Sequence, residues 1–413
     1  MNMNKTKHYR RFLLLLAMLP ATFLFTACHN DNGRSIEYIS FSQLPHDRDS
    51  MMADFDGIHQ IVVEKYSLYR QKGISMDSLY DVYSARLRNS VQTTDDYGMM
   101  LLEYFADLHC GHVNTYFSGQ HFGGAEPLYI ESRLFLNNPG DYIRGYGFRD
   151  KDEIVAINGK TVPTWMDENI RYHGGSTAAQ RALRTASSAF LSYTDTLLHV
   201  TVVRSNDTIS LPLPLHAKGY PNPNICEEKI LHDSIGYIAI YTMGNGVVEV
   251  FDSLYQSIKS LPYLIVDIRK NGGGNSENGV RLCEYLLKKE KTHCLYSRTI
   301  KPRNDAYHGK VFLLIDTPTF SAAESFAIDL WESCEVTLIG QPTAGDTGNG
   351  PELFHSQSGL YFRIPLREPL QSPDGFPLEG RGVPPHYEVA QTVKDFMAGI
   401  DTQLEFTLNL IQE

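Results

Sequence analysis

The sequence lacks both an excess of positive charge and a set of closely spaced cysteines. Its 413 residues carry 37 Lys and Arg against 48 Asp and Glu, for a formal net charge of −11. A protein that binds nucleic acid needs a surplus of Lys and Arg to neutralise phosphates, so we expect no nucleic-acid partner. The six cysteines are widely spread and form no C-x-x-C pair. We therefore expect no disulfide framework.

Three short signatures of common enzyme classes are also missing. The chain contains no G-x-x-x-x-G-K-[ST], no G-x-S-x-G and no H-E-x-x-H. These absences exclude a Walker-type phosphate loop, the ordinary nucleophile elbow of α/β-hydrolases and a zinc peptidase of the H-E-x-x-H type. What is present is ordinary globular material, 42% hydrophobic and 21% charged. The chain is long enough for about two or three domains.

The N-terminus has the features of an export signal. Basic residues within the segment Lys5–Arg11 precede an apolar run, Phe12–Phe25, which is too short for a normal membrane span. The run ends in small residues before Cys28, a pattern that resembles the bacterial lipobox. We expect residues 1–27 to be a lipoprotein signal peptide, Cys28 to be lipidated, and residues 28–50 to tether the protein to the cell envelope. A plain signal peptide with an incidental cysteine is the alternative.

After the tether, the pattern of apolar residues and turn signals differs between two successive segments. Residues 51–117 show apolar positions at three-to-four spacing, which predicts an N-terminal helical domain. Residues 118–215 hold short strands and turn signals, and the segment 147–160 resembles the PDZ signature. We expect a PDZ-like β domain that binds peptide ends by strand addition, with Tyr129–Phe135 as the edge for the terminal carboxylate. A β domain that merely spaces its neighbours is the alternative.

Residues 216–400 alternate predicted strands and helices, which indicates a layered α/β core, and residues 401–413 are expected as a C-terminal tail. Within the core, a hydrophobic strand at Val311–Ile315 runs into a turn, and a helix then opens at Ser321. The spacing of Ser321 and Glu324 is that of a capping box. The same geometry suits a nucleophile, because the free N–H groups of a helix start would face a developing oxyanion.

Three other segments carry residues that are suited to chemistry, and each has an ordinary structural explanation. Gly272–Gly274 follows a strand and would allow close backbone approach to a ligand, or would simply form a tight turn. His112 lies just past a helix end, and Glu379 lies in a Gly/Pro loop. His109, Cys110 and His112 also suggest a metal site. We set that reading aside because the sequence offers no second ligand cluster.

Taken in order, these segments resemble the carboxyl-terminal processing peptidase family, which includes the tail-specific and tricorn-type serine proteases. The matching segments are Gly111-His112, the PDZ-like module, Ile235–Ile238, Asp267–Gly274, Ser321–Ser325, Gly340–Gly345 and Glu379–Pro385. The resemblance implies a multidomain α+β protein whose α/β peptidase core is crotonase-like (ClpP-like). It also implies an enzyme that needs no cofactor and no metal.

The family has two catalytic designs, and the residue after Gly345 distinguishes them. Members with a Ser–Lys dyad have Lys there, whereas this chain has Asp346. The resemblance is therefore to the tricorn-like design with Ser, His and Glu. It implies that Ser321 is the nucleophile, that His112 is the general base and that Glu379 orients the imidazole. The N–H groups of Gly274 and Ala322 would form the oxyanion hole.

Three positions depart from the family pattern. Cys110 and His386 each stand where Asp is common, and Ala322 stands where tricorn itself has Asp. We expect a serine peptidase of the cell envelope, lipid-anchored, that acts on polypeptides either internally or at their C-terminal ends. The sequence indicates no oligomeric state. The alternatives are a catalytically degenerate lipoprotein that binds peptides or hydrophobic ligands on the same fold, and a pure PDZ-type adaptor.

Overall fold

The computed structural model describes residues 36–216, 224–296, 298–348, 350–368 and 370–413. The signal segment and Cys28 lie outside these residues, so lipidation stays a prediction. Among the helices that the structure describes, none combines the length and the apolar character needed to cross a bilayer.

Three α-helices form the helical region of the molecule. They are α1 (Arg48–Lys65), α2 (Met76–Asn89) and α3 (Thr94–Ala106), with short 3₁₀ turns η1 (Phe41–Gln43) and η2 (Ser67–Tyr69) beside them. Each helix begins where a side chain caps it, because Asp47, Ser75 and Thr93 accept hydrogen bonds from main-chain N–H groups of the first turn. The buried face of the region is rich in aromatic rings.

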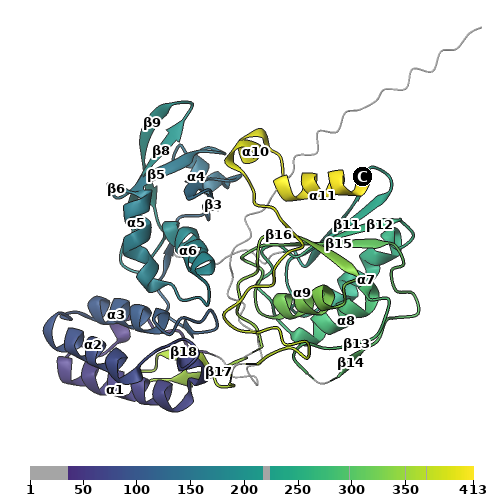
Figure 1. Cartoon of the computed structure of the whole chain (residues 1–413). Helices are drawn as coiled ribbons and strands as arrows, with labels where there is room; N and C mark the ends of the chain where they lie inside the picture. The colour runs from purple at the N-terminus through teal and green to yellow at the C-terminus, as the bar shows by residue number, and fades with distance from the viewer. Residues whose placement is uncertain (1–35, 217–223, 297, 349, 369) are drawn as a thin grey trace, which may run out of the picture.

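A later part of the chain returns to complete the helical region. Strands β17 (Pro351–His355) and β18 (Tyr361–Pro365) form a three-stranded sheet with β1 (Asn114–Thr115), in the order β1-β18-β17. Phe362 packs against Phe105 of α3, with ring centroids 5.0 Å apart. The hairpin therefore leaves the core and lies beside α1–α3, as Figure 1 shows at the lower left. The expected core range 216–400 did not anticipate this excursion.

The middle region is an antiparallel sheet with three short helices. Its strand order is β3-β4-β5-β8-β9, with β6 paired to β5. The strands are β3 (Leu128–Ile130), β4 (Arg133–Phe135), β5 (Glu153–Ile157), β6 (Lys160–Thr161), β8 (Leu197–Arg204) and β9 (Asp207–Pro214). The helices are α4 (Asp141–Gly145), α5 (Val162–Asn169) and α6 (Ala178–Ser187), with η3 (Ile170–Tyr172), η4 (Ser188–Phe190) and the small pair β2 (His121–Phe122) and β7 (Leu191–Ser192). Alternate residues of β8 point into the region's own hydrophobic core.

The core is a six-stranded sheet in the order β10-β11-β12-β15-β16-β19. Its strands are β10 (Cys226–Leu231), β11 (Ile235–Ile240), β12 (Tyr263–Asp267), β15 (Lys310–Ile315), β16 (Val336–Gly340) and β19 (Tyr387–Glu388). All neighbours are parallel except β10, which pairs with β11 in the antiparallel sense. The short pair β13 (Lys291–Thr292) and β14 (Thr299–Ile300) forms a separate two-stranded sheet.

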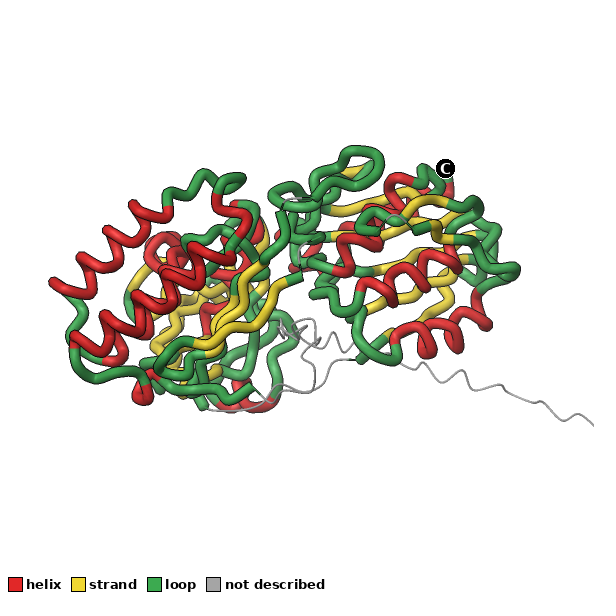
Figure 2. Tube along the Cα trace, turned by 90° about the horizontal axis from the view of Figure 1, so that it is seen from below, coloured by secondary structure: helices red, strands yellow, loops and turns green. Residues whose placement is uncertain are grey.

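Both faces of the core sheet are covered. Helices α7 (Val247–Ile258), α8 (Ser276–Leu286) and α9 (Ala322–Glu332) share one hydrophobic cluster with Leu313 and its same-face neighbours. Helix α11 (Thr402–Gln412) covers the other face, where Phe312 and Leu314 of β15 are buried. Figures 1 and 2 show these helices and strands as layers at one end of the molecule. Because parallel strands are buried on both faces, β15 is almost continuously apolar, as the sequence indicates.

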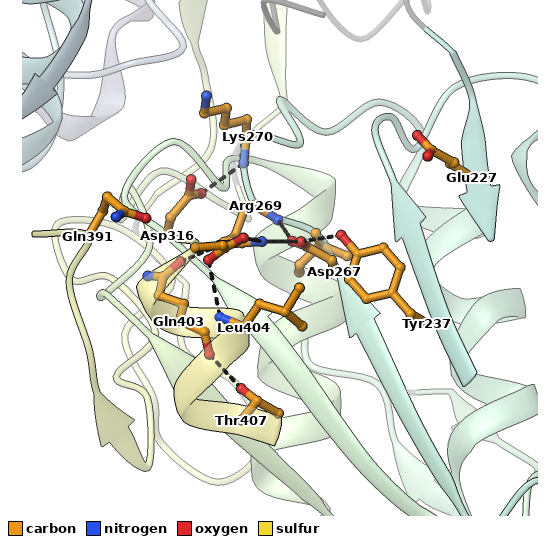
Figure 3. Close-up of polar contacts among 12 residues, drawn as sticks. Glu227, Tyr237, Asp267, Arg269, Lys270, Asp316, Gln391, Gln403, Leu404 and Thr407 are labelled. Carbon is orange, nitrogen blue, oxygen red and sulfur yellow. Dashed lines mark hydrogen bonds and ion pairs between the residues drawn. The ribbon is translucent and has the colours of Figure 1, made fainter. Parts of the chain in front are cut away.

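Residues 401–413, expected as a tail, form a helix fixed to the core. The side chain of Asp401 caps α11 and accepts hydrogen bonds from Arg269 at 2.7 and 2.8 Å, and Arg269 also pairs with Asp267 at the end of β12. Tyr237 donates to Asp267 from the neighbouring strand at 2.8 Å (Figure 3). Just before α11, helix α10 (Val393–Ala398) packs Phe396 against the middle region.

Candidate active site

Ser321 stands on a strained turn between a strand and a helix. The chain leaves β15 at Ile315 and enters α9 at Ala322, and Ser321 takes φ 57° and ψ −121°. A non-glycine residue with positive φ is uncommon, and such strain is held only where the surroundings fix it. Here the main-chain N–H of Phe320 donates to the carbonyl of Asn271 at 3.0 Å. The turn presents a hydroxyl as a nucleophile elbow does, although the G-x-S-x-G pattern is absent.

Glu324 holds the nucleophile turn to the next loop of the core. Its carboxylate accepts the main-chain N–H of Ser321 at 3.1 Å, which is the reach-back expected of a capping box. It also accepts the Thr343 hydroxyl at 2.6 Å and the N–H groups of Gly345 and Asp346 at 2.7 and 2.9 Å. Burial raises the pKa of Glu324 to about 8. The glutamate therefore does more than cap, because it fixes the position of Asp346 relative to Ser321.

His112 meets the serine directly. Its Nε2 lies 3.0 Å from Oγ of Ser321, and its ring packs on Phe320 with centroids 4.6 Å apart. The two side chains are nearly buried, at 5% and 6% exposed. Burial lowers the pKa of His112 to about 4, although Asp346 opposes the shift. The imidazole is therefore neutral near neutral pH, which is the form that accepts a proton.

The residue before His112 must be small. A Cβ atom on Gly111 would lie 2.5 Å from a carboxylate oxygen of Asp346 and 2.8 Å from the ring of Phe320. Real Cβ atoms do not approach other atoms so closely, so the Gly-His pair follows from packing. In the sequence, only the family resemblance distinguishes this pair.

Glu379 is also buried near His112 and Ser321, but neither of its carboxylate oxygens forms a hydrogen bond with Nδ1 of His112. One carboxylate oxygen pairs with Nζ of Lys72 at 2.5 Å and lies within hydrogen-bond distance of Oγ of Ser176. Among the described residues, the other oxygen has no hydrogen-bond partner, and neither has Nδ1 of His112. Burial raises the pKa of Glu379 to about 7, and the negative charge of Asp346 adds to the shift.

Asp346 is the carboxylate that the sequence analysis did not assign to the site. Its Oδ1 accepts the main-chain N–H of Gly111 at 2.6 Å, the hydroxyl of Ser176 at 2.5 Å and the thiol of Cys110 at 3.5 Å. A carboxylate oxygen of Asp346, a ring nitrogen of His112 and the sulfur of Cys110 all lie within 4.8 Å of one another. The sequence did contain a signal for Asp346, because this acid stands where members with a Ser–Lys dyad have their lysine. We took that signal only as evidence against the dyad.

Two further residues reach the site from outside the core. Lys72 follows η2 of the helical region, and Ser176 precedes α6 of the middle region. Lys72 donates to Ser176 at 2.7 Å, and Gln71 donates to the main-chain carbonyl of Glu379 at 3.0 Å. Lys72 is remote from Ser321 in the sequence, so no motif around the nucleophile indicates it. It contacts Glu379 and Ser176, whereas His112 occupies the position beside Ser321.

The glycine loop after β12 packs against the nucleophile turn. A Cβ atom on Gly273 would lie 2.7 Å from the carbonyl oxygen of Phe320 and 2.9 Å from the nitrogen of Ala322. A Cβ on Gly274 would lie 2.5 Å from Met243, and both glycines have positive φ. Glycine is therefore required for this close approach. The N–H of Gly273 itself donates to the side chain of Asn271 at 2.9 Å.

The three departures from the family pattern have different surroundings. Cys110 lies in the buried cluster with Asp346. His386 exchanges hydrogen bonds with the main chain of Leu338 on β16, at 2.8 and 2.9 Å, so it supports the sheet. Ala322 is buried at the start of α9.

The site combines a serine on a strained turn with a neutral histidine in hydrogen-bond contact, on a layered α/β sheet. This combination places the chain among the serine-type hydrolases. Comparison with known proteins gives the particular family. Residues 234–389 match the family described as "Peptidase family S41", and residues 129–215 match "Bacteroidetes, Peptidase, S41 family, N-terminal domain". The chain thus belongs to the S41 serine peptidases, which confirms the resemblance to carboxyl-terminal processing and tricorn-type peptidases.

Two curated relatives share parts of the sequence. The carboxy-terminal processing protease CtpB of Bacillus subtilis is 22% identical over 278 residues, which are 64% of this chain and 53% of CtpB. The tricorn protease of Thermoplasma acidophilum is 26% identical over 191 residues, which are 44% of this chain and 17% of tricorn. The chain therefore spans about half of CtpB and a small part of tricorn.

Solved structures share the fold across most of the chain. The structure of mature CPAF complexed with lactacystin has a TM-score of 0.73 at 13% identity, covering 88% of this chain and 97% of that one. The photosystem II D1 C-terminal processing protease has a TM-score of 0.51 at 17% identity, covering 83% and 93%. The expected mixed α/β peptidase fold with an N-terminal helical region is confirmed.

Proposed function

We propose that the protein hydrolyses peptide bonds of polypeptide substrates with Ser321 as the nucleophile. The 3.0 Å contact between Oγ of Ser321 and Nε2 of His112 carries the proposal. The hydroxyl stands on a strained turn, and burial keeps the imidazole neutral. A neutral imidazole within hydrogen-bond reach of a serine is the arrangement that activates serine to attack a carbonyl carbon.

In this reaction His112 acts first as a base and then as an acid. As Oγ of Ser321 bonds to the carbonyl carbon, Nε2 of His112 accepts the hydroxyl proton. The proton passes to the leaving amine when the C–N bond breaks, and an acyl group stays on Ser321. Water then attacks the acyl carbon while His112 accepts its proton, and the return of that proton to Ser321 releases the carboxylic acid product.

The family resemblance implies Glu379 as the acid of a Ser-His-Glu triad, and we propose that Glu379 shares this role with Asp346, which makes the larger contribution. Burial opposes ionisation of Asp346, yet His112 and Arg184 face it and lower its pKa. The pKa of Glu379 is instead raised. Asp346 therefore carries the more persistent negative charge opposite a developing imidazolium. Oγ of Ser176 lies within hydrogen-bond distance of both acids, and its single proton can be donated to either one.

The proposed oxyanion hole consists of the N–H groups of Gly274 and Ala322. Support comes from the packing of the glycine loop on the first residues of α9, where the N–H groups of a helix start have no partner within the helix. Donors of this kind are typically worth about 3–4 kcal/mol of barrier each, because they face the charge that develops in the transition state.

The middle region is proposed as the PDZ-like module that presents polypeptide chains to the crotonase-like core. Strand β3 is an edge of its sheet, and an edge strand can pair with an extended peptide. Arg133 begins β4, the strand next to this edge, but its guanidinium already pairs with Glu153. We therefore expect main-chain pairing along β3 to hold the substrate, with Arg133 contributing little.

We retain the domain division 28–50, 51–117, 118–215 and 216–400 as part of the proposal with three changes. Residues 41–50 join the helical region through η1 and the start of α1, β17 and β18 lie beside that region, and residues 401–413 join the core. The lipobox-like sequence before Cys28 supports export, lipidation of Cys28 and attachment to the cell envelope. Labelling with a radioactive fatty acid in a bacterial host tests this directly. Cys28→Ser should abolish the label, and a labelled Cys28→Ser protein would contradict the anchor.

Hydrolysis of a quenched fluorescent peptide library tests the main proposal. Wild-type protein should cleave peptides and react with a fluorophosphonate probe, whereas Ser321→Ala should do neither, because the probe needs an activated serine. Equal residual cleavage by wild type and Ser321→Ala would contradict the assignment. A folded wild-type protein that binds peptides without probe labelling would instead support the degenerate binding protein, which the comparisons do not favour.

A further inference from the structure

Three side chains with metal-binding atoms meet behind the proposed nucleophile. The sulfur of Cys110, a ring nitrogen of His112 and a carboxylate oxygen of Asp346 lie within 4.8 Å of one another. The sulfur and Oδ1 of Asp346 are 3.5 Å apart. That separation suits two ligands of one tetrahedral ion, since Zn–S bonds are about 2.3 Å and Zn–O bonds about 2.0–2.2 Å.

The imidazole offers this cluster a nitrogen that makes no hydrogen bond to the described residues. Nε2 of His112 faces Ser321, whereas Nδ1 is buried and has no hydrogen-bond partner among the described residues. A buried polar atom without a partner is costly, and a metal ion would satisfy it. Thiolate and imidazole together are ligands that Zn²⁺ prefers.

A second cluster of the same residue types shows why the first is the better metal site. His293, Cys294 and Asp329 also lie within 4.8 Å of one another. There, however, the ammonium of Lys291 contacts Asp329 at 3.0 Å, and Nδ1 of His293 already bonds to the same carboxylate. The ammonium group of Lys291 thus already occupies the position beside Asp329 that a metal ion would need.

The carboxylate of Asp346 is bonded differently. Among the described residues, it accepts hydrogen bonds from the N–H of Gly111, the thiol of Cys110, and the hydroxyl and N–H of Ser176, which are neutral groups, and the charges of Arg184 and Lys72 act on it as well. Lys72 binds Glu379 and Ser176 instead. A cation near Asp346 therefore need not displace an ammonium group from that carboxylate.

We propose that Cys110, His112 and Asp346 bind a thiophilic divalent cation such as Zn²⁺, and that the bound ion reversibly inhibits the peptidase. The inference rests on the proposed function for its inhibitory part only. When the ion binds, the sulfur of Cys110 loses its proton to solvent and bonds to the metal, and Nδ1 of His112 donates its lone pair. The neutral ring then carries its proton on Nε2.

Inhibition follows from that placement of the proton. Nε2–H can donate to Oγ of Ser321 but cannot accept the serine proton, so the base is lost while the fold is kept. Lys72 and Arg184 offset part of the negative charge near the cluster. We therefore expect weaker binding than at a structural zinc site, which suits a reversible inhibitor.

The test combines a binding signal with an activity signal in the full chain. Cd²⁺ is titrated into metal-free protein, and the near-ultraviolet absorbance of the Cd–thiolate bond is recorded. Zn²⁺ is then titrated into the peptide cleavage assay and removed with a chelator. Cys110→Ser and Cys110→Ala test the ligand, and Cys294→Ser is the matched control from the second cluster. Each variant is compared with its own metal-free rate.

We expect a stoichiometric Cd–thiolate band in wild type and in Cys294→Ser, and its loss in both Cys110 variants. We expect Zn²⁺ to lower wild-type cleavage at least tenfold, with recovery after chelation, and to inhibit the Cys110 variants at least tenfold less effectively. No band in wild type, or a band lost only in Cys294→Ser, would overturn the inference whether or not the Cys110 variants fold. A band in a protein that never cleaves peptides would support the site and contradict the proposed function.

Discussion

At the scale of single residues, the two buried acids differ in how they face the catalytic histidine. Asp346 lies within 4.8 Å of a His112 ring nitrogen and of Cys110, whereas Glu379 is paired with Lys72. We expect Asp346→Asn to lower kcat by roughly 10⁴, as replacement of a triad carboxylate by its amide does elsewhere, with KM nearly unchanged. Glu379→Gln should lower kcat by only about tenfold, the loss of one supporting interaction.

Peptide cleavage by both variants at neutral pH, after removal of metal ions, measures this difference. A matched pair of thermal unfolding curves shows that neither loss reflects unfolding. A larger fall in kcat for Glu379→Gln than for Asp346→Asn would contradict this expectation. It would mean that Glu379 is the carboxylate that stabilises the His112 imidazolium, as the family resemblance implies.

A second residue-scale prediction concerns the glycine loop. Gly273 has φ 89°, and a Cβ there would meet the Phe320 carbonyl and the Ala322 nitrogen within 2.9 Å. Gly273→Ala should therefore push the loop away from α9, lower the free energy of unfolding by about 1–3 kcal/mol and nearly abolish cleavage. Gly272→Ala is the matched control, since a Cβ there meets nothing within 4 Å. Urea unfolding and kcat decide the matter, and equal effects at the two positions would contradict it.

At the scale of elements, the ion pair at the start of α11 makes stability depend on pH. Arg269 binds both Asp401 and Asp267, and it lowers the pKa of Asp401 although burial opposes the shift. A carboxylate whose folded pKa is lowered contributes stability above its unfolded pKa of about 3.9, and that contribution is lost as pH falls through the folded pKa. We expect Asp401→Asn to cost about 2–3 kcal/mol at pH 7.

Urea midpoints of wild type and Asp401→Asn between pH 7 and pH 3 test the sign. The difference between the two urea midpoints should be constant above about pH 5 and should narrow below about pH 4. There the Asp401 carboxylate of the wild type becomes protonated, whereas the variant has no such group. Asp305→Asn removes the exposed pair of Arg303 and Asp305 and should leave the midpoint unchanged. A gap that widens toward acid would contradict the assignment.

Elements with a strong local signal were predicted from sequence, and those defined by distant packing were not. The apolar strand Val311–Ile315 and the helix after Ser321 were both expected, because burial on two faces and a capping box leave a mark on neighbouring residues. Residues 401–413 were expected as a tail and form helix α11. The apolar side chains of this helix are explained only by their packing against β15, which is distant in the sequence. The β17–β18 hairpin was missed for the same reason.

The candidate site divides in the same way. Ser321, His112 and the glycine loop were found because ordered motifs carry them, and the structure brings them together. Lys72 and Ser176 could not be found, because each lies in a separate region and meets the core only after folding. Periodicity reports on neighbours three or four positions away and contains no information on such contacts.

At the scale of the whole molecule, the buried site is the place where three regions meet. The helical region contributes Lys72, the middle region contributes Ser176, and the core contributes Glu379. The Lys72–Glu379 pair is almost fully buried, with 8% and 1% of the two side chains exposed. Removing one partner of such a pair leaves the other uncompensated.

Lys72→Met keeps an unbranched side chain of nearly the same length and removes its charge, so it tests whether that pair holds the regions together. We expect it to cost about 3 kcal/mol and to reduce cleavage, because Glu379 and Ser176 lose their shared donor. Hydrogen exchange should increase at Gly174–Thr177 and at the Glu379 loop, while β12 and β15 stay protected. The exposed Lys65→Met is the control and should change neither stability nor exchange. Uniform loss of protection across the core strands would instead mean that the pair stabilises the fold as a whole, and that the regions do not separate at this contact.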